Sequence, residues 1–356
     1  MPLKFVLSWD RYISHVGDPA MQILASNSFR WLEVHFPSDD TAPNPGVMVR
    51  IKGRLPLLRC LEIGTELGRQ DLFEDAPALI SIGGTPDPDW QLPYDQLTKL
   101  NLNYCQGDVA IPILQRCTNV QHAELDNIID WEGQDRVTMP NMRSMVITAS
   151  NDEEVIFTCN QLRLPQLDFL VLQNDVYVTR EPPLDEAGYD ILIERFFTDC
   201  SCITTFKMKG LRVSDLQLIR ILACLPQLRK LSIRNLVWYV PNAQSYSLQP
   251  SNRTISSQFI QRLTVKQDAE ELVIVPKLTE LTLASLPRDF DARSFVDMIF
   301  SRWRPRNGGP ATFDDDCLCT VKVGLKFKDD SDVAQEFSRL EPLQRLGFGF
   351  NAYEKI

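Results

Sequence analysis

One eight-residue pattern recurs along the chain and constrains its fold more than any other feature. It reads proline, any residue, apolar, any two residues, apolar, any residue, apolar. Five copies are complete: Pro56/Leu58/Leu61/Ile63, Pro140/Met142/Met145/Ile147, Pro165/Leu167/Leu170/Leu172, Pro226/Leu228/Leu231/Ile233 and Pro276/Leu278/Leu281/Leu283. Recurrence in a fixed register indicates an array of structural repeats.

Weaker copies extend this pattern toward both ends of the chain. They keep the apolar triplet without the proline: Phe29/Leu32/Val34, Leu97/Leu100/Leu102, Val120/Ala123/Leu125, Ile203/Phe206/Met208, Leu318/Val321/Val323 and Leu343/Leu346/Phe348, with Pro77/Leu79/Ile82 as a partial copy. Through the middle of the chain, the first apolar positions are 58, 79, 97, 120, 142 and 167, so the spacings are 21, 18, 23, 22 and 25 residues. This is the period of leucine-rich repeats.

Each copy predicts one short strand. Its last two apolar positions are two residues apart and therefore lie on one face of a strand. The first apolar position turns in from the preceding loop, where proline ends the helix before it. One strand with a single buried face is not stable alone, but stacked repeats share a continuous core.

The segments that return from one strand to the next have helical character. Ser214 and Gln217 form a capping box, and apolar residues at 218, 221, 222 and 225 form one stripe. Similar segments lie at 109–117, 186–200, 256–263, 293–304 and 332–340. We therefore predict an α/β leucine-rich-repeat solenoid, a horseshoe with a parallel concave sheet and convex helices, as one domain over residues 1–356.

The repeat spacing widens twice, which predicts two insertions. The distance is 36 residues from Leu167 to Ile203 and 50 residues from Leu228 to Leu278. The excess falls near 179–186 and 238–254, where we expect loops that project close to the binding face.

Composition restricts the location and partners of the protein. The formal charge is −10, and no block of basic residues suggests a nucleic-acid partner. No apolar stretch approaches the roughly 20 residues of a membrane span, and the first ten residues lack a signal-peptide layout. We expect an intracellular protein, cytoplasmic or nuclear, without a membrane partner. The acidic runs 152–154, 314–316 and 329–330 are expected to be solvated.

The sequence shows no recognisable catalytic or metal-binding pattern. His15, His35 and His122 stand far apart, and no phosphate-binding glycine loop or nucleophile elbow is present. The nine cysteines, an odd number, fit reduced core thiols better than disulfides. Cys105, three residues after Leu102, is expected to turn inward. We therefore expect no enzymatic activity, no cofactor and no metal.

Four aromatic residues are candidates for contact with a protein ligand. Trp90, Trp131, Trp238 and Tyr239 fall in predicted loops or just beyond strands. Aromatic residues at such positions are favoured as binding hot spots. They are also ordinary loop-packing residues, and the sequence leaves both interpretations open.

The chain resembles leucine-rich-repeat F-box proteins of mushroom-type fungi. Residues 92–102 (LPYDQLTKLNL) are similar to a signature segment of that family, and residues 114–120 (LQRCTNV) to the segment that follows it. Residues 28–31, 53–58 and 301–303 match further pieces in the same order. The first of these departs from the family pattern, because Asn27 precedes it where histidine is common.

The resemblance implies a binding role within a ubiquitin ligase. In that family an F-box docks to a Skp-type adaptor and a cullin, while the repeats bind the protein to be modified. The F-box and its following helix are not in this sequence, and residues 1–5 resemble the segment after them. Two hypotheses therefore remain: the substrate-recognition part of an F-box-type adaptor, with Skp-type adaptor and cullin contacts only if an F-box lies upstream, or a repeat scaffold with no ubiquitin-ligase link.

Overall fold

A computed structural model of the chain describes residues 1–6, 14–36, 45–64, 71–131, 136–175, 186–234, 255–265, 273–284, 290–303, 317–325 and 331–354. These residues form two compact units. Unit 1 comprises Met1–Thr148 with Gln161–Leu164, and unit 2 comprises Ala149–Asn160 with Pro165–Ile356. The prediction of one domain over 1–356 stays a prediction.

Unit 1 contains a ladder of parallel strands in chain order. The strands are β1 (Leu3–Val6), β2 (Trp31–Phe36), β3 (Cys60–Ile63), β4 (Ser81–Gly84), β5 (Lys99–Asn103), β6 (His122–Asp126) and β8 (Ser144–Ala149). The helical elements are α1 (Ser14–Ser26), η1 (Ser28–Arg30), α2 (Pro45–Met48), η2 (Val49–Ile51), η3 (Tyr94–Gln96) and α3 (Gly107–Arg116). A second, short ladder pairs β7 (Val137–Thr138) with β9 (Leu162–Arg163).

Unit 2 repeats the same arrangement. Its parallel strands are β10 (Phe169–Asn174), β11 (Thr205–Lys209), β12 (Lys230–Arg234), β13 (Glu280–Ala284), β14 (Thr320–Leu325) and β15 (Gly349–Glu354). Its helical elements are α4 (Asp152–Asn160), α5 (Glu186–Arg195), η4 (Phe197–Asp199), α6 (Asp215–Ala223), α7 (Ser257–Leu263), α8 (Ala292–Arg302), α9 (Ser331–Ser338) and α10 (Glu341–Arg345).

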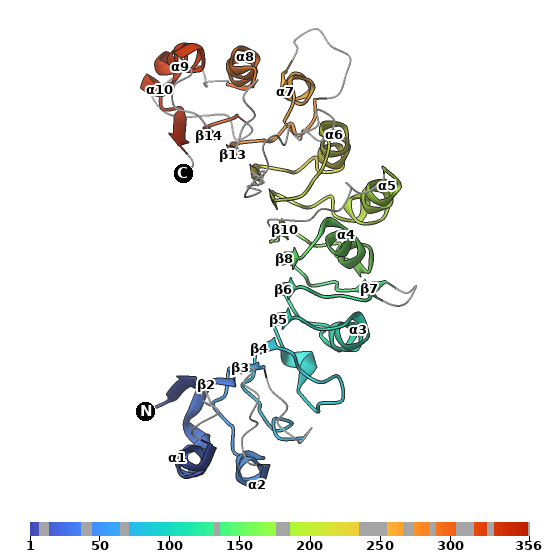
Figure 1. The fold of residues 1–356 in the computed structure, drawn as a ribbon, viewed down its shortest axis with the longest axis vertical. Helices are drawn as coiled ribbons and strands as arrows, with labels where there is room; N and C mark the ends of the chain where they lie inside the picture. The colour runs from blue at the N-terminus through green and yellow to red at the C-terminus, as the bar shows by residue number, and fades with distance from the viewer. Residues whose placement is uncertain are drawn as a thin grey trace, which may run out of the picture. The chain divides into compact units, whose positions relative to one another are not determined.

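In each unit the helices lie on one side of the strands and leave the other side open (Figure 1). Strand side chains alternate accordingly. In β11, Phe206 and Met208 are buried, whereas Lys207 between them is exposed. Adjacent strands align these positions, because Phe206 pairs with Leu231 and Met208 with Ile233. The predicted α/β leucine-rich-repeat fold is thus confirmed, with its core between strands and helices.

The register predicted from the repeated pattern holds through the middle of the chain and is wrong at the first and last copies. Every apolar position of the five complete copies is at most 2% exposed. In the first weak copy, however, Phe29 is 47% exposed, and the buried triplet is Trp31/Val34/Phe36. In the last, Leu346 is 59% exposed, and β15 begins only at Gly349. At the N-terminal end a second apolar triplet, two residues later, forms the strand instead; at the C-terminal end the strand position opposite Val321 is taken by Phe350, which is half-buried.

The predicted helical segments are confirmed with small shifts of their ends. Ser214 and Gln217 form the expected capping box at the start of α6. At α8 the side chain of Asp291 accepts a hydrogen bond from the backbone N–H of Ser294 at 2.9 Å. Hydrogen bonding from Ser294, first from its side chain and then from this backbone N–H, holds the pKa of Asp291 below its ordinary value. The insertions were predicted near 179–186 and 238–254. Residues 179–185 and 238–254 lie outside the described residues, and residue 186 begins α5.

Gly84 allows two repeats of unit 1 to approach closely. Its φ is +96°, a conformation that side-chain-bearing residues rarely adopt, and an added Cβ would stand 1.9 Å from the backbone oxygen of Ile63. This explains why glycine ends the partial copy at Pro77/Leu79/Ile82, where the other copies have a bulky apolar residue.

Candidate protein-binding faces

Open face 1 is the side of unit 1 strands that no helix covers. It is made by alternating residues of β1 to β6: Lys4, Val6, Glu33, His35, Cys60, Glu62, Ser81, Gly83, Lys99, Asn101, His122 and Glu124. Most of these side chains are polar because the opposite positions of the same strands already supply the core. A face of this kind can contact a partner without disturbing the fold.

Open face 1 is hollowed at its centre. The hollow has a volume of about 560 Å³, and its lining includes Lys4, His35, Glu62 and Asn101. Gly83 lies between Glu62 and Asn101 in the cross-strand register and contributes no side chain. The missing side chain leaves space there for a residue of a partner.

Polar side chains around this hollow are paired across neighbouring strands. Lys4 Nζ lies 2.5 Å from Glu33 Oε1, and His35 Nδ1 lies 3.3 Å from Glu62 Oε2. These side chains are 35% to 60% exposed. Pairs this exposed stabilise a fold by at most about 1 kcal/mol. Their donors and acceptors are therefore easily diverted to a partner.

Open face 2 is the corresponding side of unit 2. It is formed by Phe169, Thr205, Lys207, Lys209, Lys230, Ser232, Arg234, Glu280, Thr282, Thr320 and Lys322. Lys230 Nζ lies 2.6 Å from Glu280 Oε1, and Lys209 Nζ lies 3.5 Å from Asp175 Oδ1. The Lys207 ammonium lies 5.0 Å from the centroid of the Phe169 ring. Cationic side chains are thus frequent on this face.

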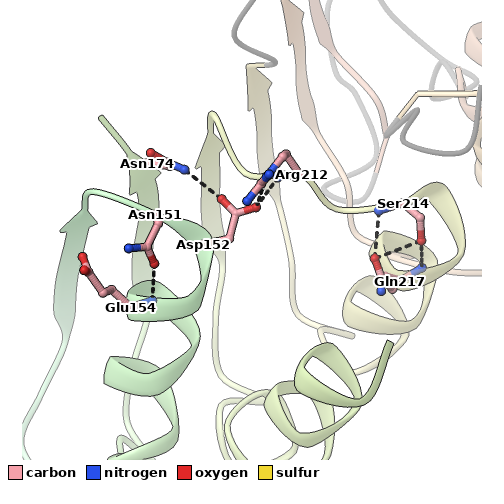
Figure 2. Close-up of polar contacts among 7 residues, drawn as sticks. All are labelled: Asn151, Asp152, Glu154, Asn174, Arg212, Ser214 and Gln217. Carbon is pink, nitrogen blue, oxygen red and sulfur yellow. Dashed lines mark hydrogen bonds and ion pairs between the residues drawn. The ribbon is translucent and has the colours of Figure 1, made fainter. Parts of the chain in front are cut away.

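A buried polar network ties together the loops at the ends of β10 and β11 in unit 2 (Figure 2). Asp152, the first residue of α4, is 0% exposed. Its carboxylate accepts hydrogen bonds from Asn174 Nδ2 at 2.9 Å and from Arg212, through Nε at 2.9 Å and the backbone N–H at 3.1 Å. A buried carboxylate requires such compensation. The network fixes the chain where two strands of open face 2 end.

Sequence reasoning missed this network, because the acidic run 152–154 was expected to be solvated. Asp152 is buried, whereas Glu153 is exposed. Asn151 and Glu154 had the spacing of a helix start: the Asn151 side chain accepts from the Glu154 N–H at 2.8 Å, and the Glu154 carboxylate accepts from the Ser150 N–H at 3.2 Å. This signal could have predicted α4, although not the partner of Asp152.

The four candidate aromatic residues lie in different environments. Trp90 is 5% exposed and stacks on Phe73 at 6.2 Å between ring centroids, so its side chain packs inside unit 1. Trp131 is half-buried, and its backbone crosses Gly107, where an added Cβ would stand 2.7 Å from the Trp131 Cα. Trp238 and Tyr239 lie outside the described residues.

Residues 301–303, one of the segments compared with F-box proteins above, have a structural role. Arg302 ends α8 and is 5% exposed, and its guanidinium donates to the backbone oxygens of Leu263, Ile274 and Val275. Leu263 is the last residue of α7, so Arg302 satisfies a carbonyl left without a partner within that helix. Residues 301–303 thus join two consecutive repeats of unit 2.

The thiols of the described residues lie mostly in apolar surroundings. Burial raises the pKa of Cys105 and Cys117 to about 12, and it raises the pKa of Cys159 well above its ordinary value. Such thiols stay protonated and are poor nucleophiles. Among the residues that the structure describes, no group of three or more histidine, cysteine or acidic side chains could hold a metal ion.

Comparison with known proteins gives a likeness to solved structures. No family model matches the chain, and no curated protein matches its sequence. A solved structure, the TLR13–ssRNA13 complex, is similar with a TM-score of 0.46 and 12% identity over 93% of this chain. That alignment covers 44% of the TLR13 chain, so this chain matches less than half of its length. Within the described ranges, no helix has the length and apolarity needed to cross a membrane.

Proposed function

We propose that this chain is a non-catalytic protein-binding module, and that it serves as the substrate-recognition part of an F-box-type ubiquitin-ligase adaptor. The observation that carries the binding role is open face 1, whose polar side chains from consecutive parallel strands surround a hollow of about 560 Å³. Repeat arrays commonly use such surfaces for binding.

A binding role without catalysis is supported by the side chains at the hollow of open face 1. The hollow is lined by lysine, histidine and glutamate, but His35 and Glu62 pair with each other in an exposed position. Cys60, the thiol on the same face, has a pKa raised chiefly by burial. An activated nucleophile needs a lowered pKa or an adjacent base. We accordingly propose that no covalent chemistry takes place there.

The ubiquitin-ligase part of the proposal is supported by the order of family-like segments along the sequence. Residues 28–31, 53–58, 92–102, 114–120 and 301–303 follow one another as in the fungal F-box proteins. In this role the chain binds the protein to be modified, and other subunits transfer ubiquitin. The alternative is a repeat scaffold with the same binding faces and no ligase contact.

The proposal is tested by isolating the tagged full-length protein from its own cells and identifying the proteins that come with it. Gly83→Gln fills the hollow without changing charge. It is structurally mild, because a Cβ at Gly83 would have its nearest neighbour, Glu62 Cγ, at 3.4 Å. The control is Ile23→Gln on α1, which changes a side chain that is 66% exposed.

We expect protein partners to be recovered with the wild type and Ile23→Gln and to be lost with Gly83→Gln. Recovery of a Skp-type adaptor and a cullin in the same isolates would support the ligase role. If both are absent while the recovery of other partners still depends on Gly83, the alternative of a repeat scaffold without a ligase contact would be favoured. Partners retained equally by all three proteins would contradict binding through open face 1.

A further inference from the structure

Open face 2 carries a positive charge that contrasts with the rest of the chain. The whole sequence has a formal charge of −10. Among the described residues, five cationic side chains lie on open face 2: Lys207, Lys209, Lys230, Arg234 and Lys322. Two carboxylates face them, Glu280 on Lys230 and Asp175 on Lys209. The described part of this face therefore has a surplus of three positive charges.

The register of the strands brings these cations close together, although their proximity does not stabilise the sheet. Lys209 is directly opposite Arg234 in the β11–β12 ladder. Like charges directly opposite each other destabilise a sheet. Lys322 lies in the same cross-strand row as Lys207, three strands away. At about 4.8 Å per strand, the two backbones are about 14 Å apart. All five cations thus lie within a patch that a short extended segment can cover.

We propose that open face 2 binds an acidic segment of a protein partner. Carboxylates at alternate positions of an extended chain are about 7 Å apart, close to the spacing of Lys207 and Lys209 along β11. The exposed cations Lys207, Arg234 and Lys322 supply positive charge that complements the carboxylates of such a segment. Asp152 and Arg212 hold the end of β11, so that part of the patch is fixed before the partner arrives.

An acidic protein segment fits this surface better than a nucleic acid does. A nucleic acid carries a regular series of phosphates along its length and is bound by basic residues that follow it. Here the positive charge is confined to a patch on a molecule with a net charge of −10, which repels a long polyanion beyond that patch. A segment with a few carboxylates matches the surplus of three charges without that repulsion.

The inference deepens the proposed binding function by naming the chemistry of the partner, and it is tested on the full chain with a defined probe. The probe is fluorescein-labelled hexa-glutamate, a short acidic segment, followed by fluorescence anisotropy. Lys207→Glu/Lys322→Glu reverses two cations of the patch. Arg293→Glu/Arg345→Glu is the matched control, because it causes the same change in net charge on helices α8 and α10. Circular dichroism confirms that each variant is folded.

The wild type should bind hexa-glutamate with an affinity that falls as sodium chloride is raised. Lys207→Glu/Lys322→Glu should weaken binding by about tenfold, and the control should change it by less than about twofold. The neutral variant Lys207→Gln/Lys322→Gln should lie between them, and it replaces the reversal if that variant does not fold.

Three results would overturn the inference: no binding of hexa-glutamate, an equal loss in the helix variant, or equally tight binding of hexa-uridylate with the same dependence on Lys207 and Lys322. None of them affects the proposed function. That function is tested through Gly83 on open face 1 and by recovered proteins rather than by an acidic probe.

Discussion

Replacing Asp152 with alanine removes the acceptor at the centre of the buried network of unit 2. The side chain of Asp152 is 0% exposed, and that of its partner Arg212 is 13% exposed. Alanine removes the carboxylate that accepts hydrogen bonds from the Arg212 guanidinium and from the buried amide of Asn174. Breaking a buried pair from one side costs about 3–5 kcal/mol. We expect a loss of about 3 kcal/mol, because the remaining exposure of Arg212 permits some hydration.

The expected loss of stability can be measured by thermal unfolding and by hydrogen exchange. For a unit of this size, about 3 kcal/mol corresponds to a decrease of roughly 6–12 °C in Tm, seen by differential scanning calorimetry. Hydrogen exchange should show faster exchange of the amides of β10 and β11 and no change in β2 or β3. The control is Glu153→Ala, one residue along α4, whose side chain is exposed; it should change stability by no more than about 0.5 kcal/mol.

A double-mutant cycle separates the pair from its surroundings. Arg212→Ala alone also leaves one buried charge uncompensated, whereas Asp152→Ala/Arg212→Ala removes both charges. The double variant should therefore cost less than the sum of the two single variants. Equal stability of Asp152→Ala and Glu153→Ala, or strict additivity in the cycle, would refute the reasoning that this network holds the loops of unit 2.

Three further predictions concern the repeats themselves. Gly84→Ala should destabilise unit 1 by several kcal/mol in urea unfolding, since its Cβ would stand 1.9 Å from a backbone oxygen, whereas Gly83→Ala should be tolerated. Asp291→Ala should cost about 1 kcal/mol at neutral pH, and this difference from the wild type should narrow as the pH falls below 3.8. The difference narrows in acid because the pKa of Asp291 is lowered by folding: the carboxylate stabilises the fold above the unfolded pKa, and this stabilisation is lost when the carboxylate is protonated. A difference in stability that stays unchanged in acid would contradict this prediction. Leu170→Asp should unfold unit 2, whereas Lys99→Ala should shift the midpoint little.

The central repeats could be predicted from the sequence because burial repeats there with a local period. Leu170 and Leu172 are buried by the same strand alternation that places Phe206 and Met208 beside them. Near the N-terminus the pattern was ambiguous, since Phe29/Leu32/Val34 and Trp31/Val34/Phe36 are both apolar. Only packing against the neighbouring strand decides between them: Val34 pairs with Leu61, and Phe36 pairs with Ile63.

The features missed at the candidate faces depend on residues far apart in the sequence. Asp152 is buried because Arg212, 60 positions later, reaches its carboxylate. Trp90 is covered because Phe73 lies against it, which no local pattern reveals. The positive charge of open face 2 likewise comes from four lysines and one arginine on three strands, β11, β12 and β14. Each of them looks like an ordinary surface residue until the register aligns them.

The most direct test of binding through the open faces is lysine footprinting. The full protein is acetylated with and without a partner recovered from its cells, and the modified lysines are identified by mass spectrometry. Binding through the open faces predicts that Lys99, Lys207 or Lys322 is protected by the partner, while Lys277, which lies in the loop before β13, reacts equally in both samples. Protection of Lys277 without any change at the three open-face lysines would contradict the account.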